Sequence, residues 1–110
     1  MPTFLDVKTI LDNTITNWAA QHGRQPDLTN HDGAAPMTWN TRAELLAAVG
    51  HGYQLIQPAV IGVDGNLANL VIDLRVGLGG VPRQMPKSGP YVAPADIQTI
   101  VDWITQGCPA

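Results

Sequence analysis

Several side chains of this sequence carry the atoms that ligate metal ions. His31, Asp32, His51 and Asp64 offer the imidazole and carboxylate donors that zinc accepts. They lie in different predicted loops and lack a ligand spacing such as H-x-x-x-H. Around Asp64 the sequence Asp-Gly-Asn is typical of a turn that leads into a helix, because a calcium loop needs more carboxylates at alternate positions. We therefore predict no metal site.

Residues suited to nucleophilic catalysis are also few. The chain has one serine, Ser88, and one cysteine, Cys108. A serine nucleophile needs a base positioned beside it, and nothing in the sequence brings a histidine such as His22 near Ser88. Cys108 lies two positions before the C-terminus, so we expect an exposed thiol, either inert or joining two chains in a dimer. These features predict a protein that is not an enzyme.

Composition limits the classes of partner. The 110 residues are 45% hydrophobic and 14% charged, which predicts one globular domain spanning residues 1–110. The formal net charge of −3 offers no positive field for nucleic acid. No stretch approaches the roughly 18–20 apolar residues of a membrane helix. No signal peptide is visible, so the location stays open: periplasmic or secreted if a signal was removed, otherwise cytoplasmic.

Apolar periodicity predicts an all-α chain. Three- and four-residue intervals between apolar positions predict helices from residue 3 to about 21, from 41 to about 50, from 67 to Gly77 or Gly79, and from 94 to about 107. Gly- and Pro-rich stretches predict two long loops, 23–40 and 79–94. No segment alternates with period two for long enough to form a sheet. Trp103, on the last helix, is expected to pack against the first helix.

Three short motifs follow one another in a recognisable order. The first helix ends in Trp18–Gly23, with the sequence W-A-A-Q-H-G; Met85-Pro86 follows later; and the last helix ends in Trp103–Gly107, with the sequence W-I-T-Q-G. Together they resemble the small c-type cytochromes, whose modules have C-x-x-C-H-G, a later Met-Pro and a last helix ending in Trp-Ile-x-x-Gly. The resemblance spans nearly the whole chain and depends on the order and spacing of motifs that are individually weak.

The resemblance implies a cytochrome c-like bundle of about four helices, with His22 and Met85 at the positions of the axial haem ligands. One departure from the family pattern is decisive for the chemistry. Trp18 and Gln21 stand where the family has its two haem-bonding cysteines. Neither side chain can form a thioether with a haem vinyl group, so covalent attachment of haem is excluded.

Two functions are compatible with this departure. In the first, haem has been lost and the domain is a non-enzymatic binding or assembly module for a partner protein or a small ligand. Its binding face would then lie on the two long loops, with Trp18, Trp39 and Tyr91 as candidate contact residues. In the second, haem is held without a covalent bond between His22 and Met85, and the protein is an electron carrier. Because Trp18 is bulky and lies one turn before His22, we favour the haem-free function.

Overall fold

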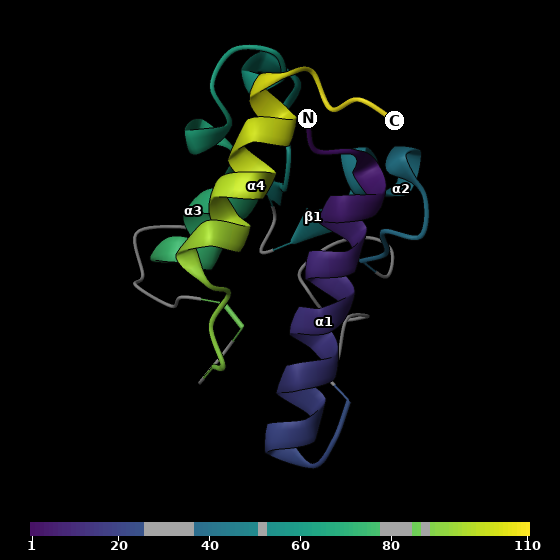
Figure 1. Ribbon diagram of the computed structural model, residues 1–110, viewed down its shortest axis with the longest axis vertical. Coiled ribbons are helices and arrows are strands. Elements are labelled where there is room, and N and C mark those ends of the chain that lie inside the picture. The colour runs from purple at the N-terminus through teal and green to yellow at the C-terminus, as the bar shows by residue number, and fades with distance from the viewer. Residues whose placement is uncertain (26–36, 51–52, 78–84, 87–88) are drawn as a thin grey trace.

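Two helices from opposite ends of the chain stand side by side (Figure 1). They are α1 (Phe4–His22) and α4 (Pro94–Thr105), seen here in a computed structural model that describes residues 1–25, 37–50, 53–77, 85–86 and 89–110. Thr3 begins α1 through a capping box with Asp6, and Gly23 ends it at a φ of 70°. Both ends agree with the helix predicted from the sequence.

The remaining elements are short. They are α2 (Arg42–Ala47), β1 (Val49–Gly50), β2 (Tyr53–Gln54), two turns of 3-10 helix named η1 (Pro58–Val60) and η2 (Gly65–Leu67), and α3 (Asn69–Arg75). The described part of the chain is mostly helical, which confirms the predicted all-α class. The two predicted long loops lie partly outside the described residues, at 26–36, 78–84 and 87–88.

The end of the second helix corrects one prediction. The apolar pattern extended that helix to residue 50, but α2 ends at Ala47 and Ala48 is extended, with φ −65° and ψ 140°. Val49 pairs with Gln54 in a two-residue antiparallel ladder, and the Leu55 N–H donates to the Ala48 carbonyl at 3.0 Å. This backbone pairing competes with another helical turn, so the prediction of no sheet was wrong at this one place.

The hydrophobic core draws on segments from both ends and the middle of the chain. Trp103 is fully buried on α4, and its ring centroid lies 6.2 Å from that of Phe4 on α1, which confirms its predicted packing. The buried members are Val7, Leu11, Leu45, Ala48, Leu55, Ile56, Val60, Ala68, Leu70, Val71, Leu74, Val92, Ile97, Ile100, Val101, Trp103, Ile104 and Cys108. No helix in the described ranges is both long and apolar enough to span a membrane.

The segment from Gly62 to the start of η2 lies directly against α4. The Gly62 N–H donates to the Ile104 carbonyl at 2.9 Å, and the Gly65 N–H donates to the Thr105 hydroxyl at 2.9 Å. A β-carbon placed on Gly65 would lie 2.3 Å from the Val101 carbonyl oxygen. Only a residue without a side chain fits at this contact.

Cys108 overturns the expectation of an exposed thiol. Its side chain is fully buried in the core, although the residue lies near the C-terminus. The Arg42 Nε donates to the Cys108 carbonyl, and the Trp103 indole N–H donates to the Pro109 carbonyl at 2.7 Å. These two bonds hold the last residues against the core. A disulfide between two chains would require this segment to leave its place.

Burial also makes the Cys108 thiol unreactive. It raises the pKa of the thiol above its ordinary value, and the charge of Arg42 offsets this in part. We expect DTNB to label the folded chain at least about a hundredfold more slowly than the chain in urea. Arg42→Gln, which removes the bond to the Cys108 carbonyl, should speed labelling of the folded chain. Equal rates with and without urea would contradict the buried thiol.

Candidate functional site

The imidazole of His22, the last residue of α1, bonds to a distant backbone group. Its Nε2 atom lies 2.8 Å from the carbonyl oxygen of Gly89. A carbonyl oxygen only accepts hydrogen bonds, so Nε2 must carry the hydrogen and donate it. The end of α1 is thereby joined to the segment that follows Met85-Pro86.

Trp18 covers this histidine from one helical turn earlier. The two rings stack with centroids 4.3 Å apart and planes 24° apart. The guanidinium carbon of Arg24 lies 5.1 Å from the centroid of a Trp18 ring, within the range of a cation–π contact. Trp18 is only 7% exposed. We call Trp18, His22 and Arg24 the α1-end cluster.

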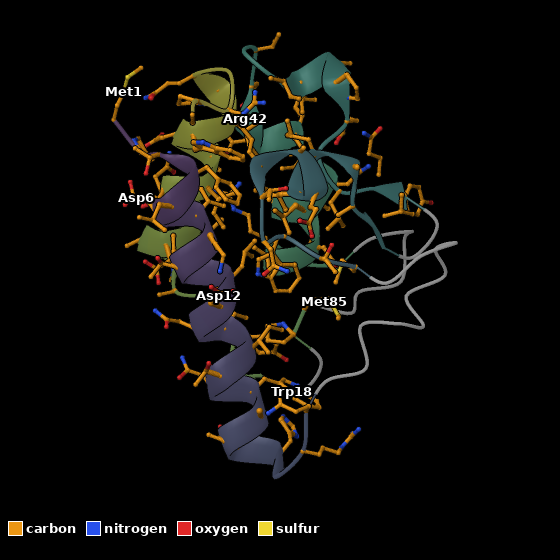
Figure 2. All side chains as sticks on the ribbon, turned by 90° about the vertical axis from the view of Figure 1, so that its right-hand side faces the viewer. Met1, Asp6, Asp12, Trp18, Arg42 and Met85 are labelled. Carbon is orange, nitrogen blue, oxygen red and sulfur yellow. The ribbon has the colours of Figure 1, made fainter. Side chains whose placement is uncertain are left out.

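Met85 is held to a different helix. Its backbone N–H donates to the carbonyl of Asp73 on α3 at 2.9 Å, and its side chain is half-buried. Figure 2 shows Met85 and Trp18 on the same side of α1, with Met85 nearer the middle of the helix. Among the described residues of this loop, Met85 thus bonds to α3 and Gly89 bonds to the end of α1.

His22 and Met85 do not fit a haem iron in this arrangement. An axial histidine gives the lone pair of Nε2 to the iron, whereas this Nε2 carries a hydrogen that it donates to Gly89. The Trp18 ring occupies one face of the imidazole. Haem could bind between His22 and Met85 only if these groups rearranged. That the chain binds no haem stays a prediction, which a hemin titration tests.

Trp39 and Tyr91 are the other candidate contact residues, and they differ from each other in burial. Trp39 is half-buried, and its indole N–H donates to Oδ1 of Asp12 at 2.9 Å. Lys8 pairs with the same carboxylate at 2.6 Å. The Lys8 hydrogen bond is the main cause that lowers the pKa of Asp12; burial opposes it, and the Trp39 bond adds to it. Tyr91 is 52% exposed, so of Trp18, Trp39 and Tyr91 it is the one that offers an exposed aromatic residue to a partner.

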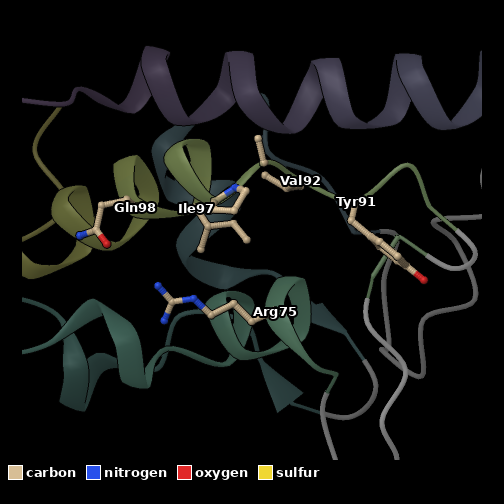
Figure 3. Close-up of a pocket in the computed structure, with 7 residues that line it drawn as sticks. Arg75, Tyr91, Val92, Ile97 and Gln98 are labelled. Carbon is tan, nitrogen blue, oxygen red and sulfur yellow. The ribbon is translucent and has the colours of Figure 1, made fainter.

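Tyr91 stands at the rim of a surface hollow of about 530 Å³. The hollow lies between the end of α3 and the beginning of α4 (Figure 3). Its lining residues are Arg75, Tyr91, Val92, Ala93, Pro94, Ile97 and Gln98. Sequence reasoning singled out only Tyr91 among them. Ile97 was expected on the inner face of the last helix, but no pattern in the sequence places Arg75 beside it.

The other side chains that could bind a metal or act as nucleophiles form no cluster among the described residues or lie outside them. No set of three or more His, Cys, Asp or Glu side chains within the described ranges could hold a metal ion. Asp64 caps η2, because its side chain accepts a hydrogen bond from the Asn66 N–H at 3.0 Å. His31, Asp32, His51 and Ser88 fall outside the described residues.

Comparison of the chain with family models, with curated proteins and with solved structures finds no match. The resemblance to c-type cytochromes therefore depends on the residues of this chain alone.

Proposed function

We propose that this chain is a cytochrome c-like domain that holds no haem and acts as a non-enzymatic binding module for a partner protein or a small ligand. The observation that carries the proposal is the bond between the His22 imidazole and the Gly89 carbonyl. At the position of the axial ligand, the histidine has a structural role: it joins the end of α1 to the loop after Met85.

The order of the elements supports the cytochrome c-like part of the proposal. A long first helix ends at His22-Gly23, Met85-Pro86 comes in the loop before the last helix, and that helix packs on the first through Trp103 and Phe4. The family's cysteines are replaced by Trp18 and Gln21. Trp18 stacks on the histidine that it precedes, which gives the replacement a packing role.

The features that favour binding lie around Tyr91, in the segment that leads from Gly89 into α4. Tyr91 exposes about half of its surface beside a hollow whose volume falls within the range of small-ligand sites, roughly 300–1,000 Å³. Tyrosine offers a large apolar contact with a polar tip and is enriched where proteins recognise partners. The hollow contains no part of the α1-end cluster.

The alternative is an electron carrier that binds haem without a covalent bond, through His22 and Met85. It would require the His22–Gly89 bond to break and the Trp18 ring to move off the imidazole. The two functions therefore differ in what hemin does to the protein.

An absorption titration with hemin separates them. We expect no saturable Soret band at one haem per chain, because Nε2 of His22 is already bonded to the Gly89 carbonyl. Long-range ¹H–¹⁵N correlation at alkaline pH should show the His22 ring protonated at Nε2. A one-to-one Soret band that shifts on reduction, and whose spin state changes in both His22→Ala and Met85→Ala, would replace the haem-free function by the electron carrier.

A further inference from the structure

The hollow beside Tyr91 places a cation next to apolar walls. Arg75 is the last residue of α3, and its side chain passes below Ile97 with the guanidinium on the side of Gln98 (Figure 3). Tyr91 lies at the opposite end of the hollow. Val92 and Ile97 are buried, so their side chains form a floor that is already part of the core.

Arg75 bonds to a neutral side chain, and no carboxylate of the described residues forms a direct ion pair with it. Its Nη1 donates to Oδ1 of Asn66 at 2.8 Å, and the Asn66 amide in turn donates to Asp64. Within the described ranges no carboxylate lies within ion-pair distance of the Arg75 guanidinium. A guanidinium has five N–H donors, so donors remain for an incoming carboxylate after the bond to Asn66.

The beginning of α4 contributes little positive potential, so the charge of the site comes from Arg75. Pro94 is the first residue of α4, and no side chain caps the first turn. Pro94 has no N–H, the Asp96 and Ile97 N–H groups already donate to the Ala93 carbonyl, and the Asp96 carboxylate in the first turn offsets the positive end of the helix dipole. The nearest acidic groups on α4 are Asp96 and Asp102, neither of which lines the hollow, and Asp102 already accepts a hydrogen bond from Gln98 at 2.9 Å.

We propose that this hollow binds a small organic anion with an apolar body, such as an aromatic carboxylate. The carboxylate pairs with Arg75, and the ring lies on the floor formed by Val92 and Ile97, against Pro94. The proposal rests on the proposed binding function and names the chemistry of the ligand. The net charge of −3 gives the protein no general attraction for anions, so binding must come from this local arrangement.

A titration with 2-naphthoate tests the site, followed in ¹H–¹⁵N correlation spectra of the whole chain. We expect saturable shifts that centre on Arg75 and on residues 91–98. Naphthalene-2-methanol, which has the same ring without the charge, should bind about tenfold more weakly, as expected for loss of a charge-assisted hydrogen bond. Shifts scattered over the surface, or equal affinity for the two compounds, would overturn the proposal.

Three arginine variants test the site in the same titration, with Arg24→Gln as the matched control for Arg75→Gln. Arg75→Gln should weaken 2-naphthoate binding about tenfold, and Arg75→Lys should restore part of the affinity. Arg24→Gln removes the same charge at the α1-end cluster and should leave the affinity unchanged. Equal affinity in the wild-type and Arg75→Gln chains would overturn the anion site. That result would not affect the haem-free function. A one-to-one hemin complex, in contrast, would overturn the haem-free function without changing the Arg75 result.

Discussion

Replacing Trp103 by alanine is expected to lower the free energy of unfolding by about 3–5 kcal/mol, the usual cost of removing a buried large aromatic side chain. Trp103 is fully buried, packs on Phe4 of α1 and donates its indole N–H to the Pro109 carbonyl. The substitution removes the aromatic contact with Phe4 between the last and first helices and one bond that holds the C-terminal segment. Since domains of this size have only about 5–15 kcal/mol of stability, much of it would be lost.

Urea unfolding followed by circular dichroism measures this effect. Trp103→Phe keeps an aromatic ring against Phe4 but loses the N–H donor and part of the buried ring volume, so it should cost less than Trp103→Ala, about 2 kcal/mol. Leu5→Ala removes an apolar side chain from the exposed face of α1, where 67% of the residue is accessible, and should change stability by less than about 0.5 kcal/mol. A loss in Trp103→Ala no larger than that in Leu5→Ala would contradict the packing of α4 on α1.

The second large effect is expected from adding one methyl group at Gly65. In Gly65→Ala the new β-carbon would lie 2.3 Å from the carbonyl oxygen of Val101, much closer than atoms can approach. The atoms on the α4 side are backbone, so relief requires η2 to move away from the helix. We expect a loss of about 3 kcal/mol or more, which corresponds to a fall in Tm of roughly 12 °C or more.

Gly62→Ala is the matched control for this steric effect. Gly62 has a positive φ of 75° and no atom within 4 Å of its added β-carbon. Alanine there suffers backbone strain without a clash and should cost about 1–2 kcal/mol. Thermal unfolding of the two variants therefore separates the close approach from the left-handed conformation. Equal losses in the two, or a neutral Gly65→Ala, would contradict the contact between η2 and α4.

Much of the helical structure could be predicted from neighbouring residues. The capping box of Thr3 and Asp6, the stop at Gly23 and the proline at the start of α4 all depend on groups within a few positions of one another. The end of α2 could not be predicted in this way. Val49 continues the apolar pattern of the helix, yet its backbone pairs with Gln54, which a periodicity argument does not consider.

The residues of the candidate site could be predicted in part, but their contacts could not. The sequence singled out His22, Met85, Trp18, Trp39 and Tyr91 by residue type and position. It could not show that the imidazole of His22 bonds to a carbonyl 67 residues away. Nor could it show that Arg75 lies beside residues 91–98, because their proximity depends on how α3 packs against α4.

The sequence by itself determined the helical class, most helix boundaries, and the absence of the cysteines that covalent haem attachment needs. Each of these follows from residue identity or from interactions within about one helical turn. Only the tertiary structure decided that Cys108 is buried, that Gly65 touches the backbone of α4, and that His22 donates to Gly89. These contacts join segments far apart in the chain, and they form only when the packing of the whole core brings the segments together.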